Sequence, residues 1–211
     1  MKNSKRIGML SFLLAAIGFC ACAQGVVTVK EDRIALPTYA PGGYDKTPLF
    51  YTGRVYQGAQ GRVYPYPMQD VLFDGKMDET YKYLTLENDW LQMGLLPEHG
   101  GHLLNLTDRQ TGFETFYRQH VVKPALIGML GAWISGGVEW NFPHHHRATT
   151  AMPIDWKLAA NADGSKTIWI GETELRRRLK WTIGLSMMPD RAVLRADNIF
   201  MNRGPFIESM I

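Results

Sequence analysis

The sequence predicts an all-β, antiparallel fold, and three observations carry that prediction. From residue 78 onward, hydrophobic and polar side chains alternate in short runs, with the period of two that half-buried strands show. Turn residues separate these runs, and Asp163-Gly164 is the clearest case because this dipeptide is typical of tight hairpins. No stretch has the apolar spacing of an amphipathic helix of three turns.

The first predicted strands follow one another closely. "YKYLTLEN" (residues 81–88) alternates rings and aliphatic side chains with polar ones, and "DWLQMGLLP" follows it across a Glu-Asn-Asp turn. "GHLLNLTD" (101–108) then leads through "RQTG" into "FETFYRQ" (113–119). Each run is short and bounded by turn residues, so we predict a strand for each of them.

Two hairpins are predicted in the second half of the chain. Residues 156–175 turn at Asp163-Gly164, and residues 179–202 turn at "MPDR", with Leu179, Trp181, Ile183 and Leu185 facing one way. The basic cluster "LRRRLK" (175–180) lies within this alternating pattern. We therefore predict that it forms a solvated strand face and not a nucleic-acid site.

The N-terminus predicts export. The basic "MKNSKR" precedes an apolar run shorter than the roughly 20 residues that span a bilayer, and Ala21-Cys22-Ala23 offers a cleavage site before Gln24. We expect residues 1–23 to be a signal peptide, with no transmembrane segment after its removal, and the protein to be periplasmic, secreted or attached to the outer membrane. Attachment would occur through a lipid anchor at Cys22, although Phe19-Cys20-Ala21 is a poor match to the residues expected before a lipidated cysteine.

Charge and cysteine content exclude several classes of protein. The chain has a net charge of +3, and the predicted signal peptide carries three of its cations, so the remainder is close to neutral. A neutral chain has no electrostatic basis for binding nucleic acid. Both cysteines lie in the signal peptide, which leaves no disulfide and no cysteine zinc site.

The ends of the remaining chain differ from its middle. Residues 24–77 are rich in Pro, Gly and Tyr, so we predict an extended segment whose rings pack on the domain formed by residues 78–211. The last predicted strand runs into "NRGPFIESMI" with no later strand to cover its edge. We therefore expect the C-terminal strands of the domain to be missing, as in a truncated fragment.

Three segments resemble a known superfamily. "LLPEHGGHLLNLTDRQTGFETFY" (95–117) resembles the opening strands of galactose mutarotase-like β-sandwiches. "IGMLGAWISGGVEWNFPHHHRATTAMP" (127–153) and "ELRRRLKWTIGLSMMPDRAVLRADNIFMNR" (174–203) are similar to a bacterial domain of unknown function in that superfamily. That domain occurs in exported or carbohydrate-linked proteins and is often followed by tetratricopeptide repeats. The resemblance covers roughly residues 70–203.

The resemblance implies an antiparallel β-supersandwich with a sugar-sized cleft on one concave face. In such mutarotases a histidine acts as general acid and a glutamate as general base. The glutamate lies late in the fold, in a region that this chain is expected to lack. The family's acid–base pair is therefore not carried over, and whether this chain is an enzyme stays open.

Read as chemistry, residues 131–150 suit a sugar site. Trp133 and Trp140 offer indole rings for stacking on C–H faces, although either ring would serve equally well in the core. Glu139, Asn141 and Arg147 offer fixed partners for hydroxyl groups. Gly136-Gly137 would let the backbone approach a ligand closely.

Histidines supply the candidate proton-transfer groups. His144 and His146 share one face of an extended loop, because neighbouring side chains alternate, and a neutral imidazole suits transfer to a ring or glycosidic oxygen. We take Glu139, His144 and His146 as the candidate catalytic residues. His99 and Glu98 are added as substrate-binding residues, on the expectation that their loop meets this one. We predict no cofactor, although His144 and His146 with a third ligand would make a metal site.

Three functions therefore remain open. The leading hypothesis is a carbohydrate-active protein that acts at an anomeric centre or a glycosidic bond. The second is a non-catalytic glycan-binding module, for example in polysaccharide utilisation. The third is a metal-binding or structural protein, including a truncated fragment without activity. Hydrolysis would need a second carboxylate about 5 to 10 Å from Glu139, and Glu98 is the candidate.

Overall fold

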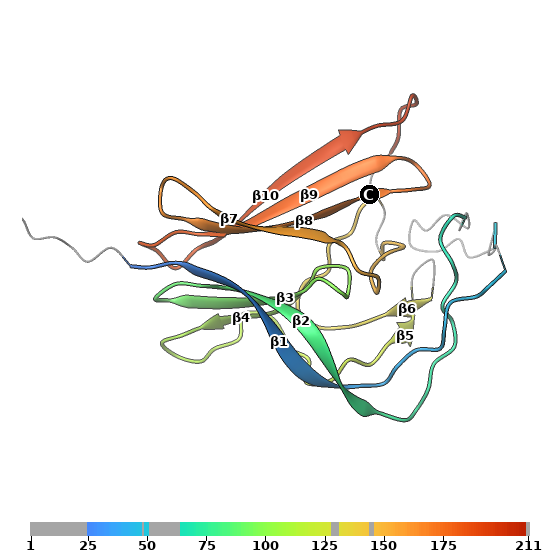
Figure 1. Ribbon diagram of the computed structural model, residues 1–211, viewed down its shortest axis with the longest axis horizontal. Helices are drawn as coiled ribbons and strands as arrows, with labels where there is room; N and C mark the ends of the chain where they lie inside the picture. The colour runs from blue at the N-terminus through green and yellow to red at the C-terminus, as the bar shows by residue number, and fades with distance from the viewer. Residues whose placement is uncertain (1–24, 48, 51–63, 128–130, 144–145, 210–211) are drawn as a thin grey trace, which may run out of the picture.

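The computed structural model describes residues 25–47, 49–50, 64–127, 131–143 and 146–209, which contain strands and no helix (Figure 1). One antiparallel sheet has the order β1-β2-β3-β4, formed by Thr28–Thr38, Met77–Glu87, Leu91–Leu96 and His102–Asp108. The other has the order β10-β9-β8-β7, formed by Leu194–Asn202, Leu179–Met187, Lys166–Glu174 and Asp155–Ala160. The predicted all-β antiparallel class is confirmed.

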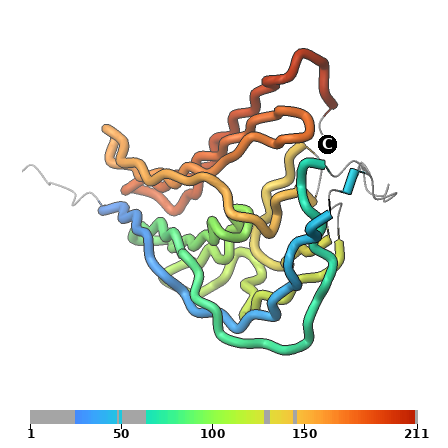
Figure 2. Tube along the Cα trace, turned by 45° about the vertical axis from the view of Figure 1, so that its right-hand side comes forward, coloured from blue at the N-terminus to red at the C-terminus, as the bar shows by residue number. Residues whose placement is uncertain are grey.

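The two sheets stack face to face as a sandwich, which both views show (Figures 1 and 2). One hydrophobic core fills the space between them, with Leu84, Leu86 and Met93 from the first sheet and Ile168 and Trp181 from the second. All five side chains are fully buried. At one end of the sandwich lies the short pair β5 (Ala125–Leu126) and β6 (Ala132–Trp133) with its connecting loops.

Most predicted strands are present, and two differences are informative. β1 lies within the segment that was predicted only as extended, and it pairs with β2 along its whole length. The alternation of hydrophobic and polar residues in β1 is weak, because most side chains on both faces of the strand are exposed. Residues 113–119 form no strand and have only the bridge between Thr107 and Glu114. The aromatic residues of this run favoured the strand prediction, but Phe113 and Tyr117 are exposed.

The prediction for the basic cluster is wrong at residues 175–178. They form the turn between β8 and β9, with Arg178 at a positive φ of 59°. Arg176 and Arg177 are paired with Glu174 and Glu208, and their side chains are 5% and 15% exposed. These two ion pairs therefore stabilise the turn.

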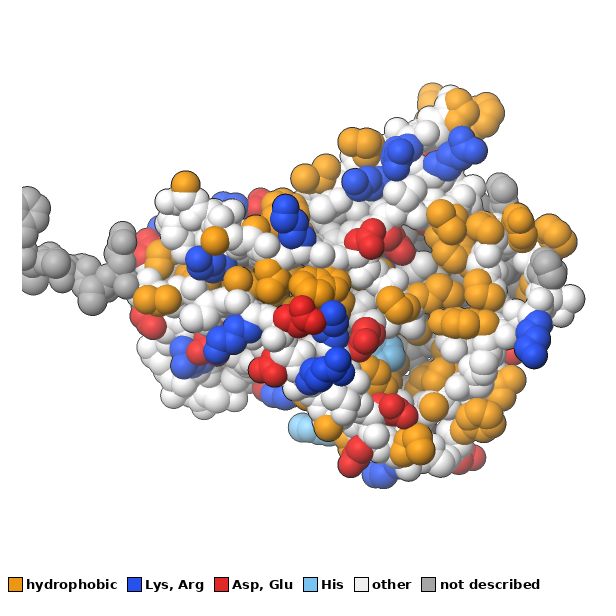
Figure 3. Space-filling view, in the orientation of Figure 1, with side chains coloured by type: hydrophobic (Ala, Val, Ile, Leu, Met, Phe, Trp, Pro, Cys, Tyr) orange, Lys and Arg blue, Asp and Glu red, His pale blue; other side chains and the backbone are white. Residues whose placement is uncertain are grey.

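The N-terminal segment packs across the end of the sandwich that holds β5 and β6. Tyr66 and Met68 are buried against Ala148, and the Tyr66 hydroxyl accepts a hydrogen bond from the Leu175 amide. Hydrophobic side chains gather over this end of the surface (Figure 3). The described part of the segment thus packs on the loop that carries Ala148.

Gly94 on β3 lets a tyrosine cross the sheet. The Tyr83 ring passes over Gly94 so that its hydroxyl donates a 2.5 Å hydrogen bond to Asn105 Oδ1 on β4. A β-bulge follows directly, between Gly94 and Leu95. A Cβ at residue 94 would overlap the tyrosine hydroxyl.

Gly94→Ala is therefore expected to lower the free energy of unfolding by about 1–3 kcal/mol, through overpacking against Tyr83. The measurement is urea unfolding. Gly75→Ala is the matched control, since a Cβ there meets no atom within 4 Å. Equal stability of the Gly94 and Gly75 variants would contradict this role.

No helix in the described ranges is long and apolar enough to cross a membrane. The predicted signal peptide and Cys22 lie outside these residues.

Candidate functional site

Residues 131–143 and 146–150 lie at the end of the sandwich, and Val138 fixes this segment to the first sheet. Val138 and Leu103 exchange two backbone hydrogen bonds of 2.9 and 3.1 Å. Gly137 has a φ of 55°, and a Cβ there would overlap the Leu103 carbonyl. This close approach explains the paired glycine in the motif, because a side chain would separate the loop from β4.

Glu139 is the centre of a polar cluster. Its Oε2 accepts a 3.0 Å hydrogen bond from Trp133 Nε1 and lies 3.1 Å from His146 Nδ1. Its Oε1 accepts a 2.5 Å hydrogen bond from the Thr150 hydroxyl. We call Trp133, Glu139, His146 and Thr150 the Glu139 cluster. The carboxylate is thereby oriented by groups from both ends of the loop, and its side chain remains 12% exposed.

His146 is held in an uncommon backbone conformation. Its φ is 49°, in the left-handed region that non-glycine residues seldom adopt. The Asn141 side chain stabilises this geometry by accepting a 3.0 Å hydrogen bond from the His146 amide. The His146 ring meets the Trp133 ring edge-on, with centroids 5.5 Å apart. The structure therefore brings together three of the predicted site residues, Trp133, Glu139 and His146. His144 lies outside the described residues.

Arg147 lies beneath the loop, where its guanidinium connects three parts of the fold. It donates a 2.5 Å hydrogen bond to the Gly100 carbonyl and lies 3.5 Å from a carboxylate oxygen of Glu172 on β8. It also stacks 4.6 Å from the Trp181 ring centroid. The side chain is only 1% exposed. These contacts give Arg147 a structural role in place of the predicted contact with sugar.

Trp140 also faces the interior. Its indole N–H donates a 2.7 Å hydrogen bond to the Gly101 carbonyl, and its ring packs against the core between the sheets. Of the two predicted stacking platforms, Trp133 is the one in the Glu139 cluster.

Glu98 and His99 lie on the turn between β3 and β4, and the contacts that the structure gives them are with residues of β2. Glu98 accepts a 2.7 Å hydrogen bond from the Lys82 amide on β2. His99 packs against Tyr81, with ring centroids 4.7 Å apart, and lines a cavity that does not include the Glu139 cluster. The expected meeting of the two loops occurs instead through Gly100 and Arg147.

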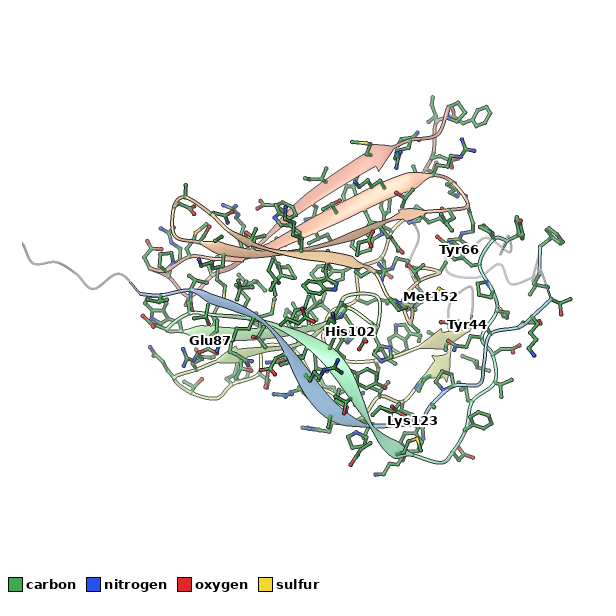
Figure 4. The ribbon with its side chains drawn as sticks, viewed as in Figure 1. Tyr44, Tyr66, Glu87, His102, Lys123 and Met152 are labelled. Carbon is green, nitrogen blue, oxygen red and sulfur yellow. The ribbon has the colours of Figure 1, made fainter. Side chains whose placement is uncertain are left out.

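His102, Thr149, Thr150 and Glu172 also shape the site and were not among the predicted site residues. Thr149 donates to Glu172 while its neighbour Thr150 donates to Glu139, so adjacent threonines join two carboxylates. His102 is buried at the start of β4 (Figure 4), where a Cβ on Gly137 would lie 3.0 Å from its Nε2. The pKa of His102 is lowered to about 4, mainly by burial and also by Arg147, although Glu139 and a hydrogen bond with the Gly136 backbone oppose this shift. In the sequence, the one feature that could have drawn attention to His102 is its position directly after Gly100-Gly101.

The described residues contain no group of three or more His, Cys, Asp or Glu side chains arranged to hold a metal ion. The histidine pair considered for a metal includes His144, which those residues do not cover.

A family model for a domain of unknown function, DUF5107, matches residues 59–211, which is more than half of the chain. The chain belongs to the DUF5107 family. The match covers both sheets except β1, and it includes every candidate site residue named above.

This DUF5107 chain is also similar to a solved structure, that of a TPR-domain containing protein from Parabacteroides distasonis. The TM-score is 0.70 at 21% sequence identity, and the match covers 82% of this chain. The chain spans 29% of the length of that protein. At this identity the likeness shows a shared fold.

Proposed function

We propose that this protein is an exported carbohydrate-binding protein and that its sugar site is the Glu139 cluster. The observation that carries the proposal is the fixed Glu139 carboxylate beside a partly exposed imidazole and indole. A carboxylate has about four lone-pair sites, and three donors already contact Glu139. One acceptor position of Glu139 therefore suits a ligand hydroxyl. The neighbouring Trp133 ring suits the C–H face of a sugar.

The cluster is pre-organised, which favours recognition. Glu139 is held by side chains from residues 133, 146 and 150, and His146 is held in turn by Asn141. Groups that are already ordered lose little conformational entropy when a ligand binds. The left-handed backbone of His146 fits this interpretation, because strained residues concentrate at binding sites.

We place the sandwich in the galactose mutarotase-like type. Support comes from the two antiparallel sheets and from the Pro97-to-Gly101 turn, where Gly100 and Gly101 adopt positive φ before β4. A concave sugar face would then lie at the end of the sandwich that holds the Glu139 cluster. Export rests on the N-terminal sequence pattern alone.

Hydrolysis has less support than binding. It needs two carboxylates about 5–10 Å apart, one of them protonated. Glu98 is bound to the β2 backbone, and Glu172 serves as the counter-ion of Arg147. The second candidate function is therefore proton transfer at an anomeric centre by Glu139 and His146, favoured by their 3.1 Å contact.

The binding test is calorimetric titration with a panel of neutral mono- and oligosaccharides. Trp133→Ala should weaken binding about tenfold or more, because it removes the stacking surface. Trp133→Phe keeps a ring and should bind within a few-fold of the wild type. Glu31→Gln, at an exposed residue on β1, is the control. No binding by the wild type, or equal binding by Trp133→Ala, would contradict the proposal.

The catalytic alternative has its own readout. Polarimetry of a freshly dissolved sugar should show faster anomer exchange with the wild type and the background rate with His146→Gln. Binding without acceleration by the wild type would leave recognition as the function.

A further inference from the structure

A second site is built around His99. The cavity beside this residue has a volume of about 170 Å³, well above the roughly 10–15 Å³ that one water molecule needs. We call it the His99 cavity. Its described walls come from the end of β1 and the N-terminal segment, from β2, from the β3–β4 turn, and from Val122, Pro124, Ile134 and Ala151. None of these described lining residues belongs to the Glu139 cluster.

The His99 ring is the unusual feature of this cavity. Both ring nitrogens are buried, and neither has a hydrogen-bond partner within the described part of the protein. Buried polar atoms in proteins are almost always hydrogen-bonded, so such a pair points to a bound group. The ring is fixed by its contact with Tyr81, whose hydroxyl is 2.8 Å from the Thr38 hydroxyl at the cavity wall.

The chemistry of the walls selects the ligand. The pKa of His99 is lowered to about 4, mainly by burial and also by the nearby His102, although Glu98 opposes this shift. At neutral pH the ring is therefore uncharged, with one N–H donor and one acceptor nitrogen, which matches a hydroxyl group that both accepts and donates. Glu79 in the wall disfavours anions, and Pro41, Val122 and Ile134 offer apolar surface.

We propose that the His99 cavity is a binding site for a small neutral polyhydroxyl molecule, of monosaccharide size or smaller, separate from the Glu139 cluster. His99 supplies the paired donor and acceptor, and the apolar wall covers a C–H face. This site stands independently of the proposed function, because it shares no residue with the Glu139 cluster.

The experiment follows the His99 ring by ¹⁵N NMR in the whole chain at pH 7. The probes are glucose and galactose, glycerol and erythritol, and galacturonate as the anionic counterpart. Saturable shifts of the His99 ring nitrogens are expected with the neutral compounds, and binding of galacturonate should be about tenfold weaker or more. Hexoses and short polyols share the required chemistry, and their relative affinities identify which of them the cavity fits.

Substitutions locate the site. His99→Phe should abolish binding, whereas His99→Gln keeps a donor and an acceptor and should retain part of the affinity. Ala40→Leu adds bulk to the cavity wall without changing His99, and it should also abolish binding. This variant provides the test if His99→Phe fails to fold. Trp133→Ala should leave these shifts unchanged, which separates this site from the Glu139 cluster. No saturable shift with any neutral compound, or equal binding of galacturonate, would overturn the proposal.

Discussion

Replacement of Arg147 with methionine is expected to lower the free energy of unfolding by about 3–5 kcal/mol. The substitution removes a buried cation and leaves Glu172 without its counter-charge. It also removes the hydrogen bond to the Gly100 carbonyl and the stacking on Trp181. The measurement is urea unfolding at pH 7.

The double variant Arg147→Met/Glu172→Gln tests the cause. Because removal of both charges of a buried pair is often close to neutral, the double variant should recover at least half of the lost stability. The amide oxygen that Glu172→Gln introduces would keep Thr149 and Trp181 as donors. Arg191→Met, at an exposed pair with Asp190, should leave the stability close to that of the wild type. A loss that the double variant does not recover would show that packing of the Arg147 side chain dominates, and not charge.

Arg147 also links stability to the candidate site. It ties the β3–β4 turn and β8 to the base of the loop that carries His146 and Thr150. Without that tie, the donors to Glu139 lose their fixed positions. We therefore expect Arg147→Met to weaken sugar binding as well, without any contact between Arg147 and the sugar.

The sandwich was largely predictable because its strands carry a local pattern. Trp181, Ile183 and Leu185 alternate with polar residues, and all three are buried between the sheets. β1 escaped a strand prediction because an exposed edge strand buries few side chains. The turn at residues 175–178 was misread because its ion pairs with Glu174 and Glu208 depend on the folded turn and on a residue distant in the sequence.

The candidate site was predictable only in part, for a related reason. Trp133, Glu139 and His146 lie within one loop, so their proximity could be expected from the sequence. The sequence does not show which polar residues point inward, and Arg147 proved to be buried. It also does not show that Glu172 on β8 meets Thr149, or that His99 belongs to a separate cavity. These are consequences of tertiary packing.

Acidification from pH 6.5 to pH 4 is expected to lower the free energy of unfolding by as much as about 5 kcal/mol. Burial lowers the pKa of both His99 and His102 from 6.5 to about 4. The unfolded chain therefore binds protons in this range while the folded protein does not. The stabilisation is complete above pH 6.5 and is lost as pH falls toward 4, at about 1.4 kcal/mol for each unit of pKa difference.

The pH window separates these histidines from the carboxylates. Hydrogen bonds from Thr47 and Thr111 lower the pKa values of Asp45 and Asp108 from 3.8, so the stability that these two groups contribute is lost mainly as pH falls below about 4. Urea unfolding at half-unit steps of pH measures the slope. His99→Gln and His102→Gln should each remove about half of it.

His120→Gln is the control for this slope, because His120 is exposed and its loss should leave the slope unchanged. A wild-type stability that stays constant between pH 6.5 and 4 would contradict burial of neutral histidines. A globular domain is stabilised by only about 5–15 kcal/mol in total. The expected loss is thus a large part of that stability, and it would make the protein sensitive to mild acid.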